Sequence, residues 1–67
     1  MTPKILGERI RELREKKGFT QRELAMRVGL SDKSISLYEK GVSYPPIRNL
    51  LVICKELEIS IGEILEH

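Results

Sequence analysis

The stretch "TQRELAMRVGLSDKSISLYEKG" (Thr20–Gly41) decides the fold, because it contains two short helices joined by one glycine turn. The first helix begins at a capping box, in which the side chains of Thr20 and Glu23 each accept a hydrogen bond from the other residue's backbone N–H. Gly29 suits the left-handed conformation that ends a helix, and a serine suited to the N-cap follows two residues later. We therefore predict two helices, over residues 21–28 and 32–40. Helices joined in this way form a helix-turn-helix unit.

Similar capping residues and apolar spacing predict three further helices along the chain. Thr2-Pro3 forms a helix start ahead of an apolar stripe at helical spacing. Apolar residues also recur every three or four positions between Ile47 and Leu57, and a second capping box runs from Ser60 to Glu63. We therefore predict an all-α fold of five short helices, over residues 3–17, 21–28, 32–40, 47–57 and 61–66.

The composition limits what so short a chain can do. With 67 residues it is expected to form one domain, residues 1–67. Cys54 is the single cysteine, so an intrachain disulfide is excluded, and one Cys with one His leaves no set of zinc ligands. Cys54 is expected to be a small buried hydrophobe. Without paired carboxylates in a pocket, we predict no enzyme, no cofactor and no metal. Without a signal peptide or a long apolar run, we expect a cytoplasmic protein that does not enter a membrane.

Charge is divided unevenly along the chain. Residues 1–40 carry 10 Lys and Arg against 6 Asp and Glu, a balance of +4. Residues 41–67 carry 2 against 4, a balance of −2. The basic part indicates an anion-binding face, although ordinary solvated helix faces would produce the same balance.

The helix predicted over residues 32–40 has two different faces. Ile35 and Tyr38 share one face and are expected to point into the core, and Glu39 leans the same way. The opposite face is short and mostly polar, and it carries Lys33, Ser36, Leu37 and Lys40. An α-helix fits the major groove of B-DNA and reaches the base edges with its first turns. A plain surface helix would also carry lysine and serine.

The same stretch resembles the helix-turn-helix of the Cro and phage-repressor type, the xenobiotic-response-element family. The resemblance is carried by Thr20-Gln21, Leu24-Ala25, Val28-Gly29, Ser31, Ile35-Ser36, and Glu39 before Gly41. It extends to "ERIRELREKKGFTQ" and "YPPIRNLLVICKELEISIGEIL", and so covers about residues 5–65. It implies a sequence-specific DNA-binding transcriptional regulator, with repression as the expected action. Such a protein would bind a palindromic operator in double-stranded DNA as a homodimer.

The third helix reads the bases in that family, so the resemblance implies base contacts by Asp32, Lys33, Ser36 and Leu37. Lys33 would donate to guanine, and Leu37 would touch a thymine methyl group. Asp32 departs from the family pattern, in which an uncharged donor such as glutamine is common. Its carboxylate would either accept a hydrogen bond from cytosine N4 or stabilise the N-terminus of the helix.

The resemblance further implies contacts with the DNA backbone and a structural ion pair. Gln21 resembles the phosphate clamp of the family. Arg22 and Arg9 are weaker candidates for a DNA contact, because a solvated surface position would explain both equally well. The other expected phosphate contacts are Arg22, Lys40, Ser43 and Tyr44. Arg14 and Glu39 resemble a buried or half-buried family ion pair that sets the angle of the reading helix.

The apolar C-terminal part predicts a partner chain. Leu50, Leu51 and Cys54 are expected to face the core, while the apolar run continues around the same helix. Members of the family dimerise through this end, and residues 58–67 are expected to contribute. The predicted dimer interface consists of Ile53, Ile61, Ile64 and Leu65. A slightly apolar monomer surface would look similar in sequence.

The same apolar end leaves a second function open. The chain would then be a protein-interaction module, such as an antitoxin or co-regulator whose main partner is another protein. The last residues, Leu65-Glu66-His67, resemble the start of an affinity-tag scar, so no function is assigned to His67.

Overall fold

The computed structural model describes residues 1–66, so His67, with the tag resemblance that rests on it, lies outside the described residues. Within residues 1–66 the chain forms five helices and no strand, which confirms the all-α prediction. The helices are α1 (Pro3–Lys16), α2 (Gln21–Val28), α3 (Asp32–Lys40), α4 (Ile47–Glu56) and α5 (Ile61–Ile64). The predicted bounds of α2 and α3 are confirmed. Helices α1 and α4 end one residue earlier than predicted, and α5 ends two residues earlier.

Local hydrogen bonds explain where α2 and α5 start. The Thr20 hydroxyl accepts from the Glu23 backbone N–H at 3.0 Å, and the Thr20 N–H donates to the Glu23 carboxylate at 2.9 Å. Ser60 caps α5 in the same position, because its hydroxyl accepts from the Glu63 N–H at 3.1 Å. Both contacts span three residues, so they form as soon as the first turn does.

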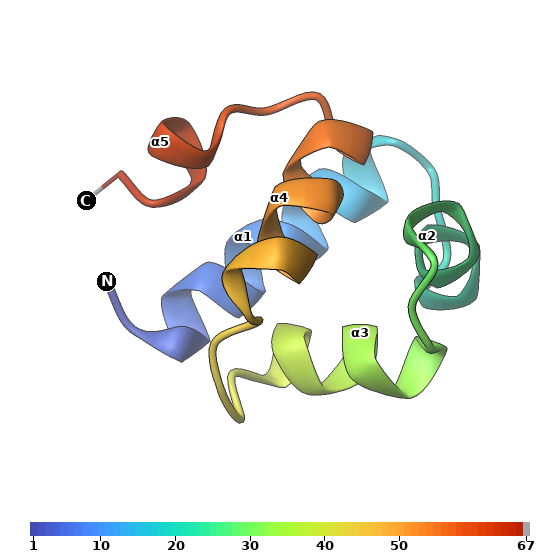
Figure 1. Ribbon diagram of the computed structural model, residues 1–67, viewed down its shortest axis with the longest axis horizontal. Helices are drawn as coiled ribbons and strands as arrows, with labels where there is room; N and C mark the ends of the chain where they lie inside the picture. The colour runs from blue at the N-terminus through green and yellow to red at the C-terminus, as the bar shows by residue number, and fades with distance from the viewer. Residues whose placement is uncertain (67) are drawn as a thin grey trace.

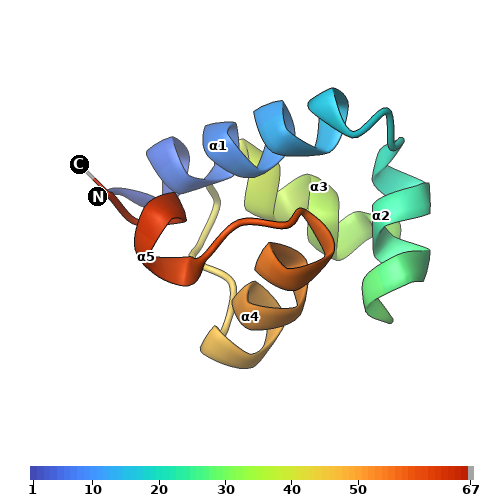
Figure 2. The same ribbon diagram turned by 90° about the horizontal axis from the view of Figure 1, so that it is seen from above.

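The helices pack in the arrangement shown in Figure 1. Helix α3 lies along one edge, with α2 at its N-terminal end, and α1 packs against α3. Helix α4 contacts α2 and α5, and α5 also contacts α1. Both views place the first and last described residues on the side away from α2 (Figures 1 and 2). None of the described helices is long and apolar enough to cross a membrane.

A single apolar core joins the five helices. Each helix contributes at least one side chain that is completely buried. The largest of these are Leu6, Ile10, Leu24, Ile35, Ile53 and Ile64. Cys54 is buried among them, as predicted, and this burial raises the pKa of its thiol.

Helix α1 approaches the end of α3 very closely at Gly7. A Cβ atom at this position would lie 2.3 Å from the carbonyl oxygen of Tyr38 and 2.7 Å from that of Glu39. Glycine within a helix costs about 1 kcal/mol relative to alanine. The close approach of two backbones is the structural reason for a glycine here.

The orientation predicted for α4 is wrong at two positions. Leu51 was expected in the core but is 49% exposed, whereas Ile53 was expected outside but is completely buried. Both orientations satisfy helical spacing, since either set of apolar residues recurs at steps of three and four. Packing of α4 against α2 and α5 selects the orientation that buries Ile53.

Candidate nucleic-acid interface

The outer face of α3 is built by a helix cap and by the burial of the opposite face. The Ser31 hydroxyl accepts from the Ser34 N–H at 3.1 Å, which starts the helix. Ile35 is completely buried and Glu39 nearly so, and this fixes which way the helix faces. The residues predicted to contact bases therefore share one side: Asp32, Lys33 and Leu37 are exposed, and Ser36 is half-buried. Their donors, acceptor and apolar group suit base edges in a major groove.

Asp32 makes a local contact at the start of α3. Its Oδ1 accepts a hydrogen bond from the backbone N–H of Lys33 at 2.9 Å. A carboxylate in the first turn also interacts favourably with the helix dipole. Of the two alternatives for Asp32, this contact favours stabilisation of the helix N-terminus.

The residues predicted to contact phosphates differ in exposure and in the contacts that they make within the chain. Arg22, Lys40 and Ser43 are exposed. Tyr44 is different, because its hydroxyl donates to the backbone carbonyl of Met1 at 2.7 Å. A phenol has one hydrogen to donate. In this structure that hydrogen is used within the chain, and the phosphate contact of Tyr44 stays a prediction.

Arg9 does not lie at this surface as a free cation. Its Nη1 donates to the carbonyl oxygen of Ile64 at 2.9 Å and also to that of Glu66. These carbonyl groups belong to the end of α5, where backbone oxygens lack helical partners. Arg9 therefore holds α5 against α1, a role that the sequence did not indicate.

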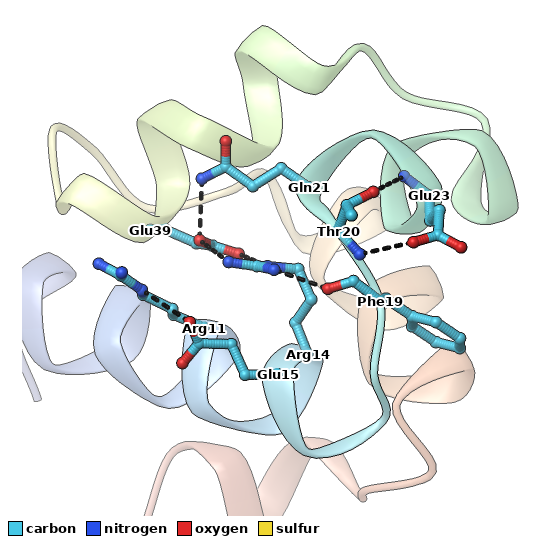
Figure 3. A network of polar contacts seen from close by, with 8 residues as sticks. All are labelled: Arg11, Arg14, Glu15, Phe19, Thr20, Gln21, Glu23 and Glu39. Atoms are coloured by element: carbon cyan, nitrogen blue, oxygen red, sulfur yellow. Dashed lines mark hydrogen bonds and ion pairs between the residues drawn. The ribbon is translucent and has the colours of Figure 1, made fainter.

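A buried ion pair connects α1 with α3 (Figure 3). Arg14 Nε donates to Glu39 Oε2 at 2.6 Å, and Arg14 Nη2 donates to Glu39 Oε1 at 3.0 Å. The two side chains are 9% and 3% exposed. Hydrogen bonding to Glu39 raises the pKa of Arg14, and this effect outweighs the lowering caused by burial. The ion pair predicted from the family resemblance is confirmed.

One backbone carbonyl group and one further side chain join this network. Arg14 Nη1 donates to the carbonyl oxygen of Phe19 at 2.7 Å, in the segment between α1 and α2. Gln21 Nε2 donates to Glu39 Oε1 at 3.0 Å, so that α2 also holds the carboxylate (Figure 3). The sequence contains no signal for the second contact, because the two residues lie 18 positions apart.

Two other cations were not identified from the sequence. Arg48 is exposed in the first turn of α4, directly after the loop that carries Ser43. Arg27 lies over the ring of Phe19, 4.2 Å from its centroid, and pairs with Glu56 at 3.2 Å. Arg48 is therefore an exposed positive charge close in the chain to Ser43, whereas Arg27 is engaged with α4.

Two residues of the predicted dimer interface are in the core. Ile53 and Ile64 are both completely buried, so a second chain could not reach them without opening the monomer. Ile61 and Leu65 are half-buried. The exposed apolar side chains of α4 are Ile47, which is 62% exposed, Leu51, one turn further along, and Val52.

The comparison with known proteins also indicates a helix-turn-helix protein. A family model described as a helix-turn-helix domain matches residues 7–66. Repressor protein C2 of Salmonella phage P22 is 36% identical over 66 residues, which cover 98% of this chain and 31% of that protein. The chain spans well under half the length of the first three curated relatives that it matches.

Solved structures share the complete fold. The restriction-modification controller protein C.AhdI from Aeromonas hydrophila matches with a TM-score of 0.88 and 32% identity, over 94% of this chain and 96% of that one. SinR, the master regulator for biofilm formation solved in complex with DNA, matches with a TM-score of 0.85 and 29% identity, over 91% and 98% of the two chains. This chain belongs to the helix-turn-helix family, and the resemblance to the Cro and phage-repressor type is confirmed.

Proposed function

We propose that this protein is a sequence-specific DNA-binding transcriptional regulator that acts as a repressor. It places α3 in the major groove of double-stranded DNA. The observation that carries the proposal is the outer face of α3, which presents Lys33, Ser36 and Leu37 beside one another while the opposite face is buried. Membership of the helix-turn-helix family supports it.

In this complex Lys33 donates to guanine, Ser36 donates or accepts, and Leu37 contacts a thymine methyl group. Phosphate contacts come from the exposed side chains around α3. These are Arg22, Lys40, Ser43 and Arg48, together with Gln21 at the start of α2. Neutralising phosphates releases counterions, so the logarithm of affinity falls linearly with the logarithm of salt concentration.

A homodimer on a palindromic operator is the form that we propose for the complex. The interface that we propose is the exposed apolar side of α4, formed by Ile47 and Leu51, together with the half-buried Ile61 and Leu65 of α5. Apolar side chains with this much exposure gain free energy when a second chain covers them. Two reading helices would then lie about 34–36 Å apart, one turn of DNA.

Selection of bound duplexes from a random DNA pool tests the function directly. We expect a recovered site with two-fold symmetry. On that site, Lys33→Ala should lose about 1–3 kcal/mol and relax the preference at one base position in each half-site. Lys55→Ala is the matched control, because Lys55 is an exposed lysine on α4 and should leave the preference unchanged.

Other outcomes point to different functions. Equal affinity for every duplex at physiological salt would reduce the protein to a nonspecific DNA binder. Absence of DNA binding, together with recovery of a stoichiometric protein partner, would favour the interaction module. Leu51→Glu separates the dimer from the reading face, since it should weaken self-association in sedimentation equilibrium and leave the preferred half-site the same.

A further inference from the structure

Gln21 differs from the other predicted phosphate contacts because its side chain turns inward. It is the first residue of α2 and is half-buried. Its Nε2 donates to Glu39 Oε1 at 3.0 Å, and Figure 3 shows the amide oxygen pointing away from that carboxylate. Arg22, one position later, is exposed. Both residues lie at the helix start, but Gln21 contacts α3 whereas the Arg22 side chain faces solvent.

The Glu39 carboxylate is held from two directions. Two nitrogen atoms of Arg14 reach it from α1, and one nitrogen atom of Gln21 reaches it from α2. Glu39 belongs to α3, three residues after Ser36 and two after Leu37. Because α3 is rigid over this length, holding Glu39 from two sides fixes the rotation of α3 about its own axis. That rotation decides where the outer side chains meet the base edges.

The amide of Gln21 also has a second hydrogen. A glutamine NH₂ group carries two donors, and Glu39 uses one of them. A phosphate oxygen at the start of α2 would accept the other, in a place where a helix N-terminus favours negative charge. One nitrogen atom would then bind the DNA backbone and the α3 carboxylate together.

We propose that Gln21 is a positioning residue for α3, which couples the phosphate contact at the start of α2 to the orientation of the reading face. Gln21 thereby contributes to discrimination between bases without touching a base. This inference rests on the proposed DNA-binding function. It differs from an ordinary phosphate contact, which weakens binding to all sequences alike when it is removed.

The test compares two affinities for each variant. One probe is a duplex recovered from the random pool, and the other is a scrambled duplex of the same length and composition. Gln21→Met keeps the length of the side chain but cannot donate a hydrogen bond, so the ratio of the two affinities should fall about fivefold. Arg22→Ala is the matched control, and it should lower both affinities by the same factor. Melting temperatures locate a working temperature at which every variant is folded.

A second experiment tests whether the effect of Gln21 on the affinity ratio depends on the Glu39 carboxylate. The paired change Arg14→Met and Glu39→Leu replaces the ion pair by apolar side chains, which often preserves stability. In that chain Gln21→Met should leave the affinity ratio unchanged. A fall as large as in the unmodified background would overturn the proposal.

Two further results would also overturn it. Equal losses on both duplexes would make Gln21 a phosphate contact alone, and unchanged affinities would leave its bond to Glu39 without consequence for DNA. Both would leave the proposed function intact. Failure of the unmodified chain to bind any duplex would overturn the proposed function as well, so the two failures are distinguishable.

Discussion

The half of the molecule formed by α1, α2 and α3 and the half formed by α4 and α5 are held in different ways. In the first half, directional contacts set the geometry: a buried ion pair, the Gln21 hydrogen bond and a backbone approach at Gly7. Hydrogen bonds and ion pairs weaken steeply when angles or distances change. Contacts of this kind therefore determine the angle at which α3 lies.

In the second half, burial of apolar side chains is the main interaction that holds the helices together. Ile53, Cys54 and Leu57 enter the core from α4 and its end, and Ile64 enters from α5. Polar contacts also reach this half, because Arg9 donates to the Ile64 carbonyl oxygen at the end of α5 and Arg27 pairs with Glu56 of α4. Apolar burial is non-directional and depends on the area removed from water. The comparison teaches that hydrogen-bond and ion-pair geometry determines how the half with α3 is arranged. The arrangement of the other half depends on which apolar side chains are buried.

The largest expected effect breaks the directional half. Glu39→Gln leaves the Arg14 charge buried without a countercharge, and should lower the free energy of unfolding by about 3–5 kcal/mol. Urea denaturation measures this change. Glu15→Gln is the control, because Glu15 pairs with Arg11 at 3.5 Å and both side chains are more than half exposed. The control should change stability by less than about 0.5 kcal/mol, and similar losses in both variants would contradict the comparison.

The next largest effect tests the apolar half. Ile53→Ala removes a completely buried side chain and should cost about 3 kcal/mol of unfolding free energy. Leu51→Ala, two positions earlier, should change it by less than about 0.5 kcal/mol at low protein concentration, because Leu51 is exposed. Thermal and urea unfolding both report the difference. The reverse order would mean that α4 has the orientation predicted from the sequence.

A smaller effect is expected at the crossing of α1 and α3. Gly7→Ala places a methyl group against two carbonyl oxygens of α3 and should destabilise the fold by about 2 kcal/mol. Gly62→Ala in α5 is the matched control, since the nearest atom, Ser60 Oγ, would be 4.0 Å away. Alanine at this helical position should be neutral or stabilising. Equal effects in calorimetry would show that the approach at Gly7 relaxes freely.

The smallest effect concerns the exposed capping box of α2. Hydrogen bonds from the Thr20 backbone and side chain hold the pKa of Glu23 below its ordinary value of 4.5. Its contribution to stability is therefore complete above that value, and is lost as pH falls through the lowered pKa. Glu23→Gln should reduce the loss of stability on acidification below pH 4.5 and have little effect at neutral pH. An unchanged slope of stability against pH would show that Glu23 does not contribute to it.

Much of the first half was predictable because its signals are local. The caps at Thr20 and Ser31 close within three residues, so the bounds of α2 and α3 follow from short stretches of sequence. The ion pair between Arg14 and Glu39 was expected from the family resemblance, and it is present. The bond from Gln21 to Glu39 was not predictable, because it depends on how α2 and α3 lie relative to each other.

The second half shows where periodicity stops being informative. Apolar residues nearly surround α4, so helical spacing allows two orientations, and the sequence-based choice between Leu51 and Ile53 was wrong. The same uncertainty placed Ile64 in the dimer interface, although it is part of the core. The contacts of Tyr44 and Arg9 with distant backbone carbonyl groups were not predictable from the sequence either.

The sequence by itself determined where the helices begin and which side chains of α3 share its outer face. Capping bonds and the helical repeat act over a few residues, and they need no other part of the chain. Tertiary structure decided which face of α4 is buried, why α1 has a glycine at Gly7, and what Gln21 holds. Those features depend on distances between helices that are remote in sequence, and such distances exist only once the whole core has packed.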